Sequence, residues 1–471
     1  MRLIKYFLLS ILFVYIFNVS LSAQSENSST LQNEFFPEFK AEDDMKPLRA
    51  GLQPFSISYG GWITSVLIDD RAGNDTSQTE ILSSVTIAKL WVRTALPLNS
   101  EIYLRARDIF SYYIDKPNEA EIDDSENDLD LDVGYFSIIN GSRTLKLFIG
   151  RKYFIIGTGL IFNGRGDGGE LDFYSGYADV KIFGAYTGLL GQISEDTNPY
   201  RLDIKDFSDD GKRIFAGGTL SKTIYNQTIY LAGLYQADKN DNIDDSLYPD
   251  AKTVYNSLYY GIGLTGIFQN AFYYGEFIIE NGSSYTDIDS TANEKQDIKA
   301  MAAKAGFNYF FDVMMRPVLL LDYAYGSGDS DRDYAPSSTN GNTKNEDKGF
   351  IYFGTYVGGF ALRPYLTNIH IYRIGLSLSP LYDIDNIMLK RINVIASYYN
   401  YQKDISIAPI NNGEATEPNK DIGHGIDFSL RWKMFSDLSI FANCGFFIPG
   451  SAYATGEMNR TFAMGGINLS F

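Results

Sequence analysis

The sequence is poor in cysteine, histidine and proline, and it has no long hydrophobic run after its first two dozen residues. The single cysteine, Cys444, excludes a disulfide framework and a cysteine-based metal site. No run of about 18 apolar residues follows residue 24, so no transmembrane helix is expected. The net charge of −18, from 40 Lys+Arg against 58 Asp+Glu, argues against nucleic acid as a partner.

Aromatic residues and glycine are abundant instead, with 35 Tyr, 32 Phe and 43 Gly, and this mixture favours β-structure. The pattern stays uniform from residue 54 to 471, so we expect one large all-β domain without an internal boundary. The acidic residues gather in the runs Glu119–Asp132, Asp238–Asp250 and Asp329–Asp347. We expect these runs to be solvated surface loops.

The N-terminus has the pattern of a secretory signal. Arg2 and Lys5 precede the uncharged run Tyr6–Val19, and small residues follow as far as Ala23. The run is shorter than the ~20 residues of a spanning helix, and no cysteine marks a lipoprotein. The predicted division is a signal peptide at 1–23, a short polar periplasmic segment at 24–53 and a barrel at 54–471. The segment 24–53 is too small for a folded plug, which favours passive passage.

Polarity alternates with period two along several segments, most clearly between Asp421 and Met434. Polar residues and glycine occupy its odd positions and apolar residues its even ones, with His424 as the exception. A helix would mix the two sets, whereas a strand places them on opposite faces. In a membrane barrel with a water-filled lumen, the apolar face meets lipid and the polar face lines the lumen.

Alternation and turn residues together predict a single transmembrane antiparallel β-barrel of about 18 strands. The predicted strands are 54–70, 80–95, 101–113, 129–139, 143–153, 167–176, 180–190, 211–223, 227–237, 252–268, 271–281, 297–311, 317–326, 367–378, 386–400, 421–434, 438–447 and 458–471. Short periplasmic turns are expected at 140–141, 225–226, 269–270 and 436–437. A barrel of this size leaves an aqueous channel.

An even strand count places both ends of the barrel on the periplasmic side. It also makes Asp329–Tyr365 one long external loop, although 350–357 could be read as a strand; such a loop can fold over the mouth or into the lumen. The chain ends in Phe471 on an alternating strand. This ending resembles the signal that the barrel-assembly machinery recognises, so we expect the outer membrane of a Gram-negative-type bacterium.

Two stretches resemble the alginate export family of outer-membrane proteins. The first runs through 150–152, 157–159, 162–168 and 171–176, and is similar to that family's strand end, inward-folding loop and returning strand. The second covers 421–427 and 446–450. Lys152 stands where the family has glutamine, and His424-Gly425 where it has Thr-Glu. The resemblance implies an 18-strand barrel with an arginine-rich constriction that passes an anionic polysaccharide.

Basic residues on strands should face the lumen, because Arg or Lys facing lipid near the midplane costs ~2–4 kcal/mol. Lys89 and Lys433 fit this expectation, and Arg165 is assigned to the inward loop. The candidate substrate-path residues are Arg93, Arg105, Arg107, Arg151, Lys152, Arg165, Asp167, Asp172, Lys304, Arg391, Asp427 and Arg431. A basic lumen would favour anions. Alternatively, these arginines pair with Asp172, Asp322 and Asp427 and merely brace the wall.

The expected function is therefore an outer-membrane channel for an anionic solute, above all in polysaccharide or uronate export, with a general or selective porin for small solutes as the alternative. Its partners would be outer-membrane lipid, the anionic solute and periplasmic export proteins. No cofactor is expected. Catalysis is not expected either, because the sequence has only two histidines and His424 has the lipid-facing parity. This leaves His370 as the one candidate for the histidine that a barrel phospholipase needs at its outer rim. Weak calcium-loop patterns occur at Asp238, Asn240 and Asn242 and at Asp329, Asp331 and Asp333, where solvated loops are the simpler expectation.

Overall fold

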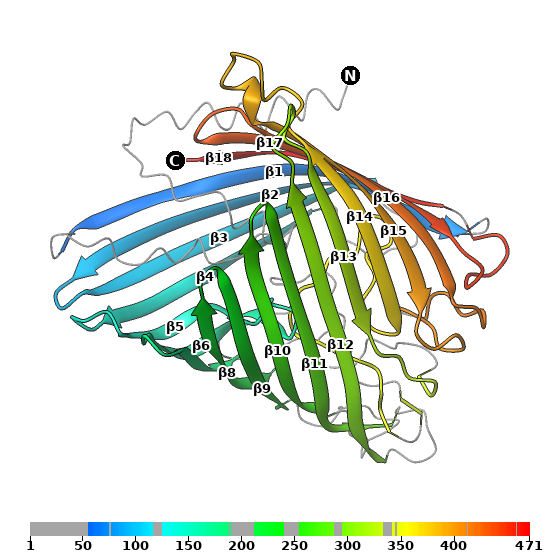
Figure 1. Cartoon of the computed structure of the whole chain (residues 1–471), viewed down its shortest axis with the longest axis horizontal. Coiled ribbons are helices and arrows are strands. Elements are labelled where there is room, and N and C mark those ends of the chain that lie inside the picture. Colours follow the sequence, from blue (N-terminus) through cyan, green and yellow to red (C-terminus); the bar gives the residue numbers. More distant parts are fainter. Residues whose placement is uncertain are drawn as a thin grey trace.

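The computed structural model describes residues 55–74, 77–115, 125–187, 189, 212–239, 254–286, 294–332, 342–343, 346–411, 413–457 and 459–471. Within them the chain forms an 18-stranded antiparallel sheet whose strands follow one another in sequence order (Figure 1). β1 (Ile57–Asn74) pairs with β18 (Arg460–Ser470), so the sheet closes into a barrel. No helix among these residues is long and apolar enough to cross a bilayer. The predicted signal peptide (1–23) and polar segment (24–53) lie outside the described residues.

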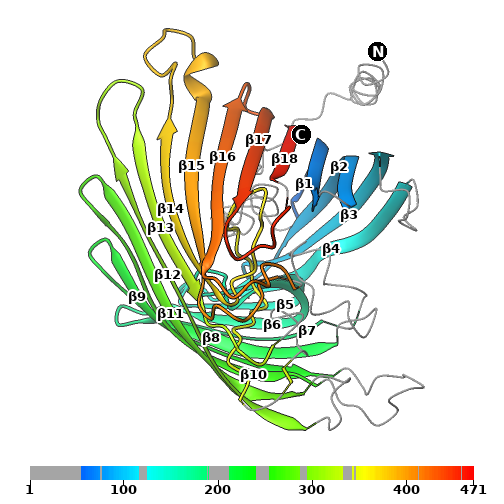
Figure 2. The same ribbon diagram turned by 90° about the vertical axis from the view of Figure 1, so that its right-hand side faces the viewer.

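The predicted all-β barrel of about 18 strands is confirmed, and each predicted strand overlaps one observed strand. The remaining strands are β2 (Ser77–Leu96), β3 (Ser100–Asp115), β4 (Ser125–Ile139), β5 (Leu145–Ile156), β6 (Phe162–Phe173), β7 (Asp179–Tyr186), β8 (Arg213–Ile224), β9 (Gln227–Asp238), β10 (Asn256–Phe268), β11 (Ala271–Tyr285), β12 (Lys295–Phe310), β13 (Val318–Gly326), β14 (Ile369–Leu378), β15 (Ile392–Lys403), β16 (Asp421–Lys433) and β17 (Leu438–Pro449). A short 3-10 helix, η2 (Leu389–Arg391), lies between β14 and β15. That connection lies on the same rim as the C terminus (Figure 2).

Two strand starts differ from the prediction by five residues or more. β6 begins at Phe162 rather than 167, because pairing with β5 keeps the glycine-rich stretch 164–166 extended. β15 begins at Ile392 rather than 386, because residues 379–391 form a connection held away from the ladder. Within it, the carbonyl of Met388 accepts a hydrogen bond from Trp432 Nε1 at 3.1 Å.

The predicted alternation of faces is observed on β16. The side chains of Ile426, Phe428 and Leu430 are exposed on the outside of the barrel, whereas Asp427 is 4% exposed and faces inward. Because the period of a strand is two, this register fixes the facing of β16 from His424 onward. Before that point a β-bulge against β15 leaves Ile422 as the extra residue, and Ile422 is fully buried, so its predicted place on the outward face is wrong. The outward row is the surface that meets lipid.

Phe428→Arg should therefore destabilise the barrel by ~2–4 kcal/mol, the cost of a cation on the lipid face near the midplane. Ser429→Arg places the same side chain on the inward face one residue later, and we expect a change below ~1 kcal/mol, as for solvated positions. Urea unfolding of both variants, folded into bilayers, measures the difference. Equal losses would contradict the assigned facing.

β5 and β6 leave the barrel wall together. Pairing of β5 with β4 stops at Arg151, and pairing of β6 with β7 stops at Asp167. The two strands nevertheless pair with each other as far as Ile156 opposite Phe162. We call residues 152–166 the inner hairpin, since they have no wall neighbour among the described strands and extend into the barrel.

Two facing glycines allow the hairpin to bend away. Gly150 pairs with Gly168, and Gly150 has a φ of 134°. A Cβ on Gly150 would lie 2.3 Å from the carbonyl oxygen of Gly134, and one on Gly168 would lie 1.9 Å from that of Gly184. Both distances are far below van der Waals contact, so only glycine permits the backbones to approach this closely.

The long connection between β13 and β14 also folds into the barrel. We call residues 346–368 the inner loop. The backbone N–H of Phe353 donates to the carbonyl of Ile161 at the hairpin tip at 2.9 Å. Further along, the N–H of Phe360 donates to the carboxylate of Asp427 on β16 at 3.0 Å. The predicted long loop is thus confirmed, with no strand at 350–357, and it crosses the lumen (Figure 2).

Aromatic side chains fill the space between the inner hairpin, the inner loop and one wall of the barrel. Phe162 of the hairpin stacks on Phe215 of β8 with ring centroids 4.2 Å apart, and Phe353 of the loop meets Phe215 at 5.3 Å. Tyr259 of β10 belongs to the same buried cluster. An apolar core therefore occupies this side of the lumen and holds both inner segments in place.

Candidate functional site

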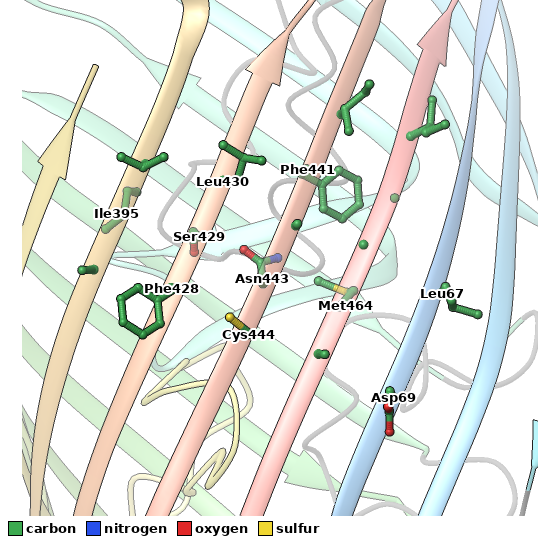
Figure 3. Close-up of a pocket in the computed structure, with 18 of the residues that line it drawn as sticks. Leu67, Asp69, Ile395, Phe428, Ser429, Leu430, Phe441, Asn443, Cys444 and Met464 are labelled. Carbon is green, nitrogen blue, oxygen red and sulfur yellow. The ribbon is translucent and has the colours of Figure 1, made fainter. Parts of the chain in front are cut away.

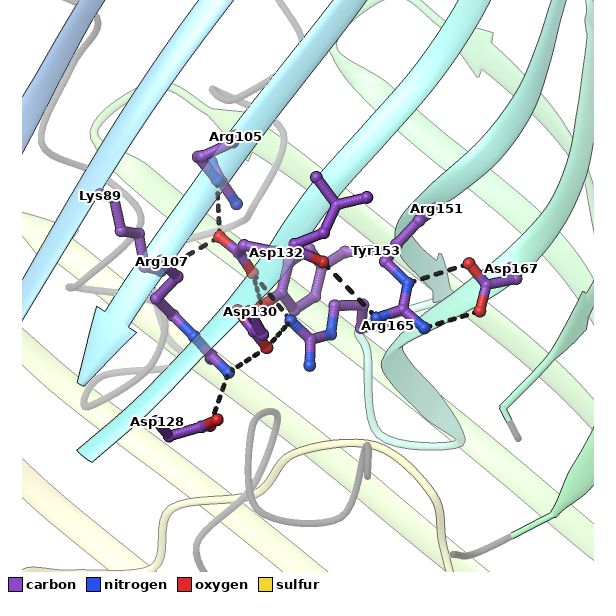
Figure 4. A network of polar contacts seen from close by, with 11 residues as sticks. Lys89, Arg105, Arg107, Asp128, Asp130, Asp132, Arg151, Tyr153, Arg165 and Asp167 are labelled. Carbon is purple, nitrogen blue, oxygen red and sulfur yellow. Dashed lines mark hydrogen bonds and ion pairs between the residues drawn. The ribbon is translucent and has the colours of Figure 1, made fainter. Parts of the chain in front are cut away.

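The candidate site is the constriction, formed by the inner hairpin, the inner loop and the walls that face them. On one wall, basic and acidic side chains form a compact network (Figure 4). We call it the arginine cluster; its members are Lys89, Arg105, Arg107, Arg165, Asp130 and Asp132. Its four cationic residues are each 0–1% exposed. The network joins strands β2, β3 and β4 to the inner hairpin.

Asp132 is the centre of the arginine cluster. It lies 2.6 Å from Arg105, 3.5 Å from Arg165 and 3.7 Å from Lys89, and it accepts a hydrogen bond from the hydroxyl of Tyr153 at 2.9 Å. Asp132 is itself fully buried. A buried carboxylate with several cationic partners is well compensated, so this network fastens the hairpin to the wall.

A β-bulge places Asp132 in the lumen. β3 and β4 pair with Arg105 opposite Val133 and then with Ala106 opposite Leu131, so Asp132 is the extra residue. Bulges of this kind redirect a side chain. Asp130 lies two residues earlier and pairs with Arg107 at 2.9 Å and with Arg165 at 2.6 Å.

The prediction of a solvated loop over Glu119–Asp132 is wrong from residue 125 onward, and the predicted strand 129–139 had already included the last four of these residues. Residues 125–132 belong to β4, and Asp130 and Asp132 face inward. The sequence Asp-Leu-Asp-Leu-Asp over 128–132 carries the signal, since its acids alternate with lipid-facing leucines.

Arg165 was expected in a loop, but it lies on β6. Arg151 and Asp167 pair with two hydrogen bonds of 2.9 and 2.7 Å at the base of the hairpin. Arg151 has the parity of Ile149, which is exposed to lipid, yet Arg151 is 2% exposed. The bend after Gly150 explains this, because both faces of the inner hairpin lie inside the barrel.

The hairpin tip is anchored across the lumen by Glu276 of β11. The hydroxyl of Thr158 donates to Oε2 of Glu276 at 2.5 Å, and its backbone N–H lies 3.3 Å from Oε1. The hydroxyl of Tyr230 on β9 donates to the same Oε1 at 2.8 Å. A Cβ on Gly157 would meet Oε1 at 2.0 Å, so the contact is close. Nothing in the sequence joins residues so far apart.

Lys304 of β12 faces the lumen near this anchor and is partly exposed. Its Nζ lies 5.3 Å from the ring centre of Tyr274 and 5.9 Å from that of Tyr356 on the inner loop. Lys304 pairs across the strands with Glu276, whose oxygens are engaged by Thr158 and Tyr230.

The other residues predicted to line the solute path lie elsewhere inside the barrel, with the exception of Arg391. Arg93 pairs with Glu101 at 2.6 Å, and Lys152 pairs with Glu170 at 2.6 Å. Asp172 is contacted by the hydroxyl of Tyr174 at 3.4 Å, Asp427 holds the inner loop, and Arg431 is on the inward side of β16. Arg391 lies in η2 on the rim and is exposed, so the prediction that it sits on a strand is wrong.

Of the acids expected to brace the wall, Asp322 does pair with an arginine. It lies 3.3 Å from Arg373 of β14 and accepts a hydrogen bond from Tyr274 at 2.7 Å. Arg373 was not singled out from the sequence, because its strand alternates poorly. The acids that neutralise the arginine cluster are Asp130 and Asp132 instead.

Where the calcium patterns are described, their carboxylates are engaged by other groups of the chain. Asp329 is 3% exposed, so the expectation of a solvated loop is wrong at this position. Asp329 accepts the backbone N–H groups of Asp331 at 2.8 Å and Lys348 at 2.6 Å, and burial raises the pKa of its carboxyl. Asp238 lies 3.5 Å from Arg213. The remaining candidates, Asn240, Asn242 and Asp333, lie outside the described residues. No group of three metal-ligating side chains occurs in the described part of the chain.

His370 has no catalytic arrangement around it in the described structure. Its Nδ1 shares a hydrogen bond of 3.0 Å with the hydroxyl of Tyr323, and its Nε2 lies 3.7 Å from Asp404. A hydrolase triad would require a serine at the ring nitrogen opposite the carboxylate, and a tyrosine occupies that position.

A hollow of 1090 Å³ lies at strands β14 to β18 and the neighbouring β1 and β2 (Figure 3). Most of its lining is apolar and belongs to the outward row, including Phe428, Leu430 and Cys444, and Asp69 is the one charged residue among the lining residues. It has the chemistry of the lipid face, so we do not place the solute path there.

Comparison with known proteins gives a family and a fold. A family model described as alginate export matches residues 201–464. No curated protein matches the chain. Several solved barrels are similar in structure, all at low sequence identity. OccK2 of Pseudomonas aeruginosa in complex with glucuronate has 13% identity, covers 89% of this chain and 100% of its own, and has a TM-score of 0.52.

Two further solved structures show the same fold. OccAB1 of Acinetobacter baumannii has 11% identity, with 90% of this chain and 100% of its own covered and a TM-score of 0.54. A BenF-like porin from Pseudomonas fluorescens has 9% identity, with 88% and 99% covered and a TM-score of 0.53.

Proposed function

The chain belongs to the alginate export family of outer-membrane channels, and we propose that it passes an anionic, uronate-containing polysaccharide through the constriction. It is an outer-membrane β-barrel channel and not an enzyme. Passage through such a barrel is passive, and its selectivity is set by the charges and the width of its narrowest part.

The observation that carries the proposal is the gathering of four cationic side chains around two buried carboxylates, among the described residues, where the inner hairpin enters the lumen. Lys89, Arg105, Arg107 and Arg165 share Asp130 and Asp132, and the third acid, Asp128, is 3.9 Å from Arg107 and 58% exposed. Charges held in a low-dielectric wall act on the adjoining water-filled space. A net positive field at the constriction attracts carboxylates and repels small cations.

Passage of single uronate units is a second candidate. It is favoured by the similar fold of a porin solved with glucuronate, a uronate monomer. The two candidates differ in what occupies the constriction: a polymer threads it and blocks ion current for long periods, whereas a monomer produces brief or no blocking.

Channels in planar bilayers under a salt gradient should show a reversal potential of the sign for anion preference. Oligogalacturonate should block the current, while a neutral maltodextrin of equal length should not, because the field acts on carboxylates. Cation preference in the wild-type channel would overturn the proposed function. Block by glucuronate alone, with no added effect of chain length, would favour the monomer.

A further inference from the structure

We propose that Lys304 is the residue that contacts the carboxylate of the passing uronate, while the arginine cluster holds the inner hairpin and acts on the solute only through its field. The inference rests on the proposed function and assigns its contact site. Two properties separate Lys304 from the arginine cluster: its side chain is more exposed, and it forms no direct ion pair with a carboxylate of the described residues.

The cations of the arginine cluster are inaccessible. Arg105, Arg107 and Arg165 are each 1% exposed, and each lies within 3 Å of a carboxylate oxygen of Asp130 or Asp132. A solute carboxylate would have to displace one of these acids from the buried network, which removes a well-formed pair before any new contact forms. These side chains are therefore poor direct ligands for a solute in transit.

Lys304 differs in both respects. It is partly exposed on the inward face of β12, and its ammonium group makes no ion pair with a carboxylate of the described residues. The nearest acid by strand pairing is Glu276, whose Oε1 and Oε2 accept hydrogen bonds from Thr158 and Tyr230. The carboxylate of Glu276 keeps its charge, but the hairpin anchor holds its oxygens and they form no ion pair with Lys304, so the ammonium group can still donate hydrogen bonds to a solute.

The surroundings of Lys304 suit a sugar acid. The ring centres of Tyr274 and Tyr356 lie 5.3 and 5.9 Å from the ammonium nitrogen. Tyr274 is partly exposed, so its ring can pack against the apolar C–H side of a pyranose, whereas Tyr356 is 8% exposed and only packs behind the lysine. An ammonium group donates charge-assisted hydrogen bonds to a carboxylate. Tyr356 belongs to the inner loop, so the contact lies within the constriction itself. A polymer of uronate rings, each with an apolar C–H side and a carboxylate, is the class of ligand that can contact both the aromatic ring and the ammonium group.

Lys304→Gln should raise the half-blocking concentration of oligogalacturonate about tenfold, the loss expected for one charge-assisted hydrogen bond. Lys304→Arg should retain most of the block, because it keeps the charge. The matched control is Lys295→Gln at the first residue of the same strand, where the lysine is exposed. This control has the same change of charge outside the lumen and should leave the block unchanged.

The outcomes separate the two proposals. If the wild-type channel prefers anions and is blocked, but Lys304→Gln leaves the block unchanged, the assignment of Lys304 is wrong and the proposed function stands. If the wild-type channel neither prefers anions nor is blocked, the proposed function itself fails. Heat-modifiable migration in gels verifies that each variant is folded, so that loss of block cannot come from loss of the barrel.

Discussion

Replacing the tip of the inner hairpin by a two-residue turn is expected to raise the single-channel conductance several-fold. Phe154 pairs with Gly164, so residues 155–163 can be replaced by Asn-Gly, which closes a hairpin between paired residues. The shortened hairpin no longer reaches Glu276 or the inner loop, and the lumen widens toward that of an open barrel of this size. Conductance in symmetric salt measures the change.

Glu276→Gln serves as the graded control for this experiment. It retains a hydrogen-bond acceptor for Thr158 and removes only the charge, so the tip should stay in place and the conductance should change far less than in the deletion. The inner loop also holds the tip, because the backbone N–H of Thr355 donates to the carbonyl of Gly159 at 2.9 Å. A deletion variant with wild-type conductance would show that the hairpin does not limit the passage.

Asp132→Asn should destabilise the folded barrel by ~3–5 kcal/mol, because it leaves buried cations without their shared carboxylate. Asp132 is fully buried between Lys89, Arg105 and Arg165. The amide can replace the hydrogen bond from Tyr153, but it cannot replace the charge. The unfolding free energy in urea, measured with the protein in bilayers, gives the size of the loss.

Asp128→Asn is the matched control for this variant. It makes the same change on the same strand, but Asp128 is 58% exposed and lies 3.9 Å from Arg107. Exposed pairs contribute about 0–1 kcal/mol, so its unfolding free energy should stay near that of the wild type. Equal and small losses in both variants would mean that the arginine cluster does not fasten the hairpin.

The closed barrel could be predicted from the sequence because each strand residue faces either lipid or the lumen. The polarity of a residue and of its immediate neighbours in the sequence indicates which of the two it faces. Ile426, Phe428 and Leu430 alternate with Asp427, and this period of two fixes the facing of these residues without knowledge of the neighbouring strands. The same property gave the strand count, the short turns and the long loop before β14. For the inward loop, a resemblance to a known family was needed.

The arrangement of the constriction was decided only by the tertiary structure. The β-bulge at Asp132 depends on the register of β4 against β3, and the bend of the hairpin depends on the approach of Gly150 to the backbone of β4. Thr158 and Glu276 are 118 residues apart in the chain. The pairing of each cation with its carboxylate depends on such contacts between residues that are far apart in the sequence. Alternation determines that Lys304 and Arg105 both face inward, but only the fold determines that Arg105 is buried against Asp132 while Lys304 stays partly exposed beside an acid that is already engaged.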